Sequence, residues 1–346
     1  MPAIMLLLTE LEFFIIKYGD EYQLGRTHMQ DATPITLNTY ISSFTSQLHG
    51  YMTHLEQAIS DLHSIGQGGT AVGSGINTNK NFSILFINEL NILFENKSFP
   101  PLFKLHDSKL ATTTSHDAIL NLQSILASIA TGLIKLSNDI ILLNSGPRSG
   151  IGEFKYYAEE PGSSLMPGKS NPTQCESLNM ISCQVLGYYN AMLIANSMGT
   201  LELNVYKPLM IYNIIQSIQL LSGGITSFSS HCIRQLTINK EQMHENVHNS
   251  LMLSTVLSTE IGYQRAAEVA KLAETTGKTL KYIAVVELQY LTAEKYDTLI
   301  NSAFSTGNGN GNGTQNQIQN PVEEQNQAEE EEENILPPPS NKYNEY

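Results

Sequence analysis

The sequence predicts an all-α protein built around a bundle of long helices. Apolar residues recur at alternating spacings of three and four over residues 119–143, which is the heptad pattern of a helix that packs along a seam. Residues 41–62 repeat that spacing. No strands alternate with the helices, so a doubly wound sheet is not expected.

The first two long helices follow directly from this spacing. One begins near Thr36, after Pro34, and ends before Gly66. The other covers residues 119–143, where the charged side chains are Lys135 and Asp139. A helix that is apolar on more than one face is buried on several sides, so we expect it in the middle of the bundle.

The third long helix is predicted to begin at Pro172. Asn171 can act as its N-cap, Pro172 suits the first helical position, and Gln174 lies three residues after the cap. This arrangement indicates a loop that feeds directly into a helix.

The fourth long helix is predicted over residues 208–221, with Gly223 and Gly224 ending it. Shorter helices are expected over residues 240–304. We therefore divide the chain into a central helical-bundle domain, a partial C-terminal helical domain and a disordered tail, over residues 1–235, 236–304 and 305–346. The tail is rich in Asn, Gly and Glu, a composition that cannot bury enough apolar area to fold.

Composition and charge exclude several classes of protein. The chain has 346 residues, 33 acidic and 19 basic side chains and a net charge of −14, so it lacks the basic character of a nucleic-acid binder. The tail holds eight Glu and one Lys, which is −7, or half of that charge. No run of apolar residues reaches eighteen, so the sequence does not predict a membrane span. Three cysteines without a CxxC pair predict neither a disulfide framework nor a zinc site, and they favour a reducing compartment.

The segment GSSLMPGKSNP, residues 162–172, has the densest chemical signal. Its glycines and prolines exclude helix and strand, so it is a loop. The loop carries hydroxyls and one cation, and the helix after it directs its N-terminal amides back toward the loop. Such a place attracts an anion and can lower the pKa of a hydroxyl, although an ordinary capped loop has the same composition.

A second cluster, GRTHMQD over residues 25–31, places Arg26, Thr27 and His28 side by side. Histidine is the side chain best suited to proton transfer near neutral pH. Glu176, near the start of the third long helix, could orient and charge such a histidine, a pairing hypothesised from residue type alone.

These segments resemble the class II fumarate hydratases of the fumarase/aspartase superfamily. The likeness extends over roughly residues 9–300 and includes, in order, GRTHMQDATPITL (25–37), GGTAVGSGIN (68–77), SGPRSGIGE (145–153), the loop, NPTQCESL (171–178), LELNVYKP (201–208) and SLMLSTVLSTEIGY (250–263). Several long motifs in the right order are more specific than one short pattern. His28 after Thr27 favours the fumarase branch.

The resemblance implies a helical-bundle homotetramer whose active sites are shared between subunits. It implies reversible hydration of fumarate to (S)-malate, a step of the tricarboxylic acid cycle, without a metal or organic cofactor. The compartment would be the mitochondrial matrix or the cytosol.

The resemblance also implies roles for single residues. Ser163 would be the base that removes the C3 proton of malate, giving an aci-carboxylate. His28, paired with Glu176, would handle the water or hydroxyl at C2. The substrate contacts would be Thr27, Ser164, Lys169, Ser170 and Asn171, with Lys169 and Asn171 stabilising the charge of the aci-carboxylate.

The chain differs from the family pattern at its N-terminus, because family members begin well before the position that corresponds to Met1. We expect an N-terminal truncation, which would remove the family's substrate-carboxylate loop and the first bundle helix. The truncated chain is then expected to be weakly active, or to be an inactive fragment or pseudoenzyme. Its uncovered apolar faces predict poor solubility.

A competing motif, HENVH over residues 244–248, fits the HExxH pattern of zinc metalloproteases. Glu260 or Glu268 could be proposed as the third ligand. The pattern arises easily by chance in a helix, and this stretch resembles a plain helical segment of the fumarases, so the zinc interpretation is not favoured.

Overall fold

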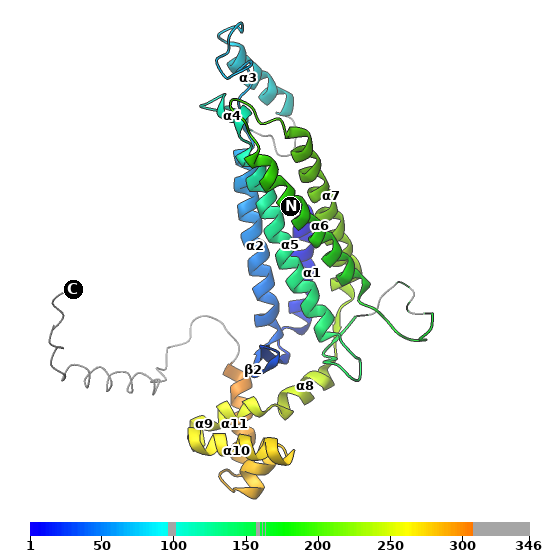
Figure 1. Cartoon of the computed structure of the whole chain (residues 1–346). Helices are drawn as coiled ribbons and strands as arrows, with labels where there is room; N and C mark the ends of the chain where they lie inside the picture. Colours follow the sequence, from blue (N-terminus) through cyan, green and yellow to red (C-terminus); the bar gives the residue numbers. More distant parts are fainter. Residues whose placement is uncertain (96–101, 157–159, 161, 163, 307–346) are drawn as a thin grey trace, which may run out of the picture. The chain divides into compact units, whose positions relative to one another are not determined.

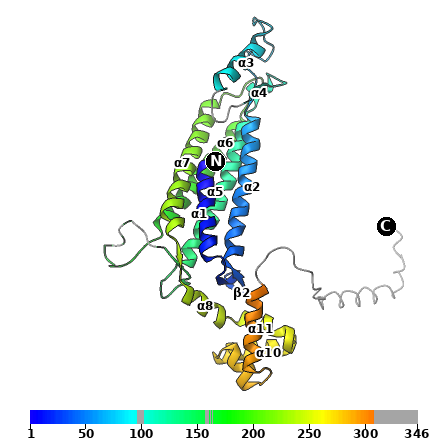
Figure 2. The same cartoon turned by 180° about the vertical axis from the view of Figure 1, so that it is seen from behind.

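The fold is known from a computed structural model that describes residues 1–95, 102–156, 160, 162 and 164–306. Within those residues five long helices form a bundle, shown from two sides in Figure 1 and Figure 2: α1 (Pro2–Tyr18), α2 (Leu37–Asp61), α5 (Asp117–Leu143), α6 (Thr173–Ser197) and α7 (Lys207–His231). The helical-bundle fold class is therefore confirmed.

Helix α5 packs against three neighbours, α2, α6 and α7. The apolar seam predicted for it is almost wholly buried, at Leu122, Leu126, Ile129, Leu133, Leu136, Ile140 and Leu143. By length and composition α5 could also cross a membrane, but half of its most apolar stretch is buried inside the protein. Burial among three helices is the packing of a core helix.

Helix α2 begins as the sequence predicts. Thr36 is its N-cap, and the Thr36 hydroxyl accepts a hydrogen bond from the Thr39 amide at 3.1 Å, which satisfies one free amide of the first turn. The helix ends at Asp61, before Gly66.

Helix α7 contradicts the predicted stop at Gly223 and Gly224, because it runs through both glycines to His231. A Cβ atom on Gly224 would lie 2.7 Å from the Ile181 Cδ1 atom of α6. Gly224 therefore allows α6 and α7 to approach closely, and it does not end the helix. A Cβ on Gly223 would meet no atom within 4 Å.

Helix α1 is a bundle helix that the sequence analysis did not assign. Its Leu7, Leu11 and Phe14 are buried in the core shared by the long helices, where α1 packs against α2 and α7. A cavity of about 290 Å³ lies at its N-terminal end, lined by apolar residues such as Leu122 of α5 and Leu221 of α7.

In the part of the chain that the structure describes, short strands interrupt the helical pattern at three places, none of which was predicted from the sequence. They form an antiparallel hairpin of β1 (Tyr22–Thr27) and β2 (Gln30–Thr36), a parallel pair of β3 (Ser64–Ile65) and β4 (Lys104–Leu105), and an antiparallel pair of β5 (Phe154–Lys155) and β6 (Thr237–Ile238). Two short helices, α3 (Phe82–Phe94) and α4 (Ala111–Thr114), flank β4 in the sequence.

Shorter helices follow the bundle, as predicted for residues 240–304. They are α8 (Lys240–Asn249), α9 (Ser254–Ile261), α10 (Tyr263–Thr276) and α11 (Ala293–Thr306), together with 3₁₀ turns η1 (Ile233–Gln235) and η2 (Leu251–Leu253) and the π-helical turn η3 (Tyr282–Glu287). A second hydrophobic core, which includes Leu257, Val269 and Ile283, joins α9, α10 and α11. The domain division at residue 235 stays a prediction, and the tail from residue 307 lies outside the described residues.

Candidate active site

Thr27 and His28 lie at the tip of the β1–β2 hairpin. Thr27 pairs with Gln30, so His28 and Met29 alone form the turn between the strands. Both turn residues have positive φ, 53° and 61°, as the twist of a two-residue hairpin requires. The Thr27 and His28 side chains are exposed, which leaves them open to a substrate or to another chain.

The loop before α6 closes on itself at a glycine. A Cβ atom on Gly162 would lie 1.9 Å from the Lys169 carbonyl oxygen, so no larger residue fits there without movement. The side chains of Ser164, Lys169 and Ser170 are exposed, and that of Asn171 is half-buried. Ser163, the predicted base, lies outside the described residues.

The start of α6 differs from the predicted cap. The helix begins at Thr173, and Asn171 forms no side-chain cap. Instead the Glu160 carboxylate accepts hydrogen bonds from the Thr173 hydroxyl at 2.6 Å and from the Gln174 side-chain amide at 2.7 Å. These two bonds lower the pKa of Glu160. A carboxylate therefore already lies at the first turn of α6, where the helix dipole favours negative charge.

Glu176 lies in the first turn of α6 itself and is exposed. Within the described part of this single chain, no hydrogen bond or ion pair joins Glu176 to His28. One chain thus brings Ser164, Lys169, Ser170 and Asn171 together in the loop and places Thr27 and His28 on a separate hairpin.

A salt bridge anchors the hairpin to two other parts of the chain. The Arg26 guanidinium donates to both carboxylate oxygens of Glu153, at 3.0 and 2.8 Å. The Asn246 side-chain amide of α8 donates to Glu153 Oε1 at 2.8 Å. Arg26 belongs to the polar cluster that the sequence predicts, whereas the roles of Glu153 and Asn246 were not predicted, because contacts between distant segments leave no local pattern.

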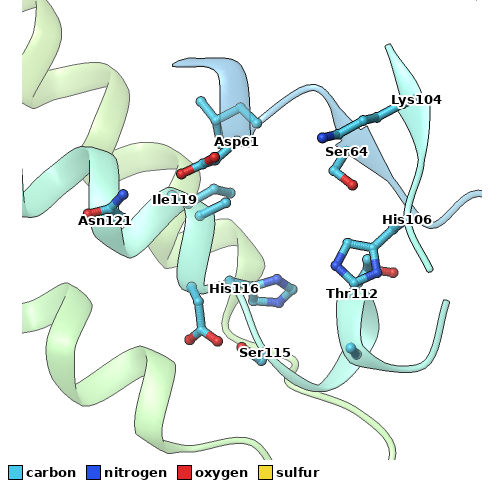
Figure 3. A pocket seen from close by; sticks show the side chains of 13 residues that line it. Asp61, Ser64, Lys104, His106, Thr112, Ser115, His116, Ile119 and Asn121 are labelled. Carbon is cyan, nitrogen blue, oxygen red and sulfur yellow. The ribbon is translucent and has the colours of Figure 1, made fainter. Parts of the chain in front are cut away.

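A polar pocket of about 580 Å³ lies at the other end of α2 (Figure 3). Lys104 of β4 and the imidazoles of His106 and His116 point into it, beside Asp61 at the end of α2. Burial, with a smaller contribution from the charge of Lys207, lowers the pKa of His116. None of the predicted site residues lines this pocket, and the sequence analysis did not single out its histidines.

The HENVH segment forms part of α8. The His244 and His248 rings stack with centroids 3.8 Å apart, and His248 Nδ1 lies 2.9 Å from the His244 carbonyl oxygen. The two suggested third ligands have other partners, because Glu260 pairs with Lys295 and Glu268 accepts a hydrogen bond from the Tyr290 hydroxyl. Among the described residues, no three His, Cys, Asp or Glu side chains lie together in a way that could hold a metal ion.

Comparison with known proteins links both halves of the chain to one group of enzymes. A model of a lyase family matches residues 16–187, and a model of the fumarase C C-terminus matches residues 253–303. The class II fumarate hydratase of Thermosynechococcus vestitus is 43% identical over 307 residues, which are 89% of this chain and 64% of that protein. The one from Rickettsia prowazekii is 42% identical over 299 residues, 86% of this chain and 64% of that protein.

A solved structure supports the same relation. The class II fumarase of Schistosoma mansoni superposes with a TM-score of 0.82 at 38% identity, over 86% of this chain and 64% of that one. The chain therefore spans just under two thirds of the length of these relatives.

Proposed function

Because the chain belongs to the lyase family of the class II fumarate hydratases, we propose that it hydrates fumarate reversibly to (S)-malate. The observation that carries this proposal is the match itself, which extends over 89% of the chain. The part that matches the lyase family, residues 16–187, includes both the hairpin and the loop. The proposed reaction uses no metal and no organic cofactor.

The chemistry starts from the residues of the loop. In the direction of dehydration, Ser163 takes the C3 proton of malate, and the electron pair passes into the neighbouring carboxylate. The resulting aci-carboxylate carries two negative charges. The ammonium group of Lys169 and the amide of Asn171 stabilise it, because fixed donors aimed at developing charge lower the barrier without reorganisation. Ser164, Ser170 and Thr27 hold the substrate.

His28 completes the reaction at C2. It donates a proton to the departing hydroxyl, or takes one from the attacking water in the direction of hydration. Glu176 would orient the imidazole and stabilise its charged form. Because His28 and Glu176 are not joined within one chain, we propose that the pair forms between subunits of a homotetramer.

The exposed surface supports such an assembly. Along α7, Ile211, Tyr212, Ile215 and Ile218 are between 44 and 57% exposed, and on α6 Met180 and Ile194 are 67 and 64% exposed. Two adjacent helices with this much uncovered apolar surface are typical of an interface between subunits.

A second candidate is a protein that keeps this fold without turnover, as an inactive fragment or pseudoenzyme. The observation that favours it is the coverage, because the chain spans 64% of the length of the Thermosynechococcus vestitus enzyme. Loss of positioning groups removes most of a rate enhancement even where the base is retained.

The loss of fumarate absorbance in the presence of the purified chain distinguishes the two. We expect turnover well below the value of about 10 per second that is common among enzymes. Absence of any turnover by a folded, assembled chain would favour the second candidate.

A further inference from the structure

The backbone of the His28 turn is energetically unfavourable by itself. Two-residue turns with positive φ at both positions favour Asn-Gly, whereas this turn is His28-Met29. Residues other than glycine remain in the left-handed region when the surrounding structure holds them there. Something outside the turn must therefore fix it.

The backbone pairing of the hairpin by itself is too short and irregular to fix the conformation of the turn. Its register shifts between Leu24 and Arg26, two residues before the turn, and a Cβ on Gly25 would lie 2.5 Å from the Thr33 carbonyl oxygen. Such a bulge interrupts the regular pairing and bends the strand. The pairing close to the turn is thus limited to Arg26 with Asp31 and Thr27 with Gln30.

The firm attachment is the Arg26 side chain. Both of its terminal nitrogens donate to Glu153, whose side chain is completely buried. A bidentate pair of this kind fixes orientation as well as distance. A buried carboxylate without a partner is strongly destabilising, so the Arg26 guanidinium is held against Glu153.

Glu153 is in turn held by the segment around α8. Asn246 donates to Glu153 Oε1 at 2.8 Å, Gln242 donates to Asn246 Oδ1 at 2.9 Å, and the Asn239 amide donates to the Glu153 carbonyl oxygen at 2.7 Å. Asn246 is the central residue of the HENVH segment, so this segment contributes a hydrogen bond to the hairpin anchor.

We infer that Glu153 and Asn246 are positioning residues, which hold the His28 turn in its left-handed conformation through Arg26. Neither residue needs to contact the substrate. The consequence for catalysis rests on the proposed function, whereas the positioning of the turn does not.

Hydrogen–deuterium exchange of the full chain tests the positioning without an activity assay. Glu153→Gln removes the charge, and Asn246→Ala removes one donor and is the milder change. We expect exchange of the amides of residues 26–30 to rise by about tenfold or more in both variants, since each loses a hydrogen bond to a charged group. Exchange within α5 should stay within about twofold of the unmodified protein.

Glu21→Gln is the matched control. It removes the exposed ion pair of Glu21 with Lys240, which joins the start of the same hairpin to the start of α8. We expect no change at residues 26–30 in this variant. Unchanged exchange at the turn in Asn246→Ala would overturn the inference, and so would an equal rise within α5, because that result indicates global destabilisation.

In protein that turns over fumarate, Asn246→Ala should lower kcat while KM stays within about twofold, since a displaced His28 affects the chemical step more than ground-state binding. A change in KM alone would contradict a positioning role.

Discussion

Tyr40 of α2 and Asp139 of α5, ninety-nine residues apart in sequence, are joined by a hydrogen bond from the Tyr40 hydroxyl to Asp139 Oδ2 at 2.8 Å. Asp139 also pairs with Lys135 on its own helix. Burial, followed by the nearby charge of Asp139 and the hydrogen bond to it, raises the pKa of Tyr40 far above its ordinary value. The bond ties the two central helices together as long as the phenol keeps its proton.

This raised pKa predicts a loss of stability at alkaline pH. The unfolded phenol releases its proton near pH 10, whereas the folded one retains it, so the free energy of unfolding should be intact below pH 10 and fall above it. The slope contributed by one such proton is about 1.4 kcal/mol per pH unit. Urea titrations at several pH values between 9 and 11.5 give the free energy of unfolding at each pH. Its decrease with pH should be smaller in Tyr40→Phe and unchanged in Tyr263→Phe, which removes an exposed phenol. Equal slopes in the two variants would contradict this.

The two neighbouring glycines of α7 should respond in opposite directions. Gly224→Val introduces branched carbon against Ile181 and should lower the free energy of unfolding by about 1–3 kcal/mol through overpacking. Gly223→Ala adds a methyl group in open space and should raise it by about 0.5–1 kcal/mol through helix propensity. Chemical denaturation measures both, and a destabilised Gly223→Ala would show that α7 has no room there.

These glycines show where sequence reasoning on the fold was correct and where it failed. The heptad spacing predicted α2 and α5, because a helix buried on one or more sides must repeat its apolar residues near every 3.6 positions. A glycine in the sequence can end a helix or can lie inside one where a neighbouring helix packs closely, and the residue type alone does not distinguish these two roles. The structure distinguishes them for Gly224, because the Ile181 side chain of α6 occupies the space that a side chain at this position would need. The β1–β2 hairpin was missed because its turn lacks an Asn-Gly pair.

The candidate site was predicted unevenly for the same kind of reason. Local motifs supplied the loop and the Thr27–His28 pair, because their glycines, prolines and polar residues are adjacent in sequence. Glu160, whose carboxylate contacts the first turn of α6, and Glu153 behind Arg26 were not predicted, because each contacts residues that are not its neighbours in sequence. The pairing of His28 with Glu176 stays a prediction.

The exposed apolar surface of α6 and α7 predicts self-association. We expect light scattering to report tetramers or larger aggregates and few monomers at micromolar concentration. Ile215→Glu, at the 44% exposed position on α7, should shift the protein toward smaller species, because it places a charge in the contact. Glu241→Gln on α8 serves as the control. A monodisperse monomer of the unmodified chain would contradict the proposed subunit interface.

The three cysteines should differ sharply in reactivity. Cys175 and Cys232 are buried with their sulfur atoms 3.7 Å apart, whereas Cys183 is exposed. The hydrogen bond with Cys175 and burial raise the pKa of Cys232 well above its usual value, which disfavours the reactive thiolate. A thiol reagent should therefore modify no cysteine other than Cys183 in the native state and all three in denaturant. Rapid native labelling in Cys183→Ser would show that the buried pair is accessible.

We propose that the loop and the hairpin together add water across the double bond of fumarate. Incubation of the chain with fumarate in D₂O, followed by proton NMR, measures this addition directly. We expect malate that carries one deuterium at C3. Ser163→Ala should form it at least about a hundredfold more slowly, because removal of a general base has an effect of this size. Absence of deuterated malate from a folded, assembled chain, or an equal yield from Ser163→Ala, would contradict the proposal.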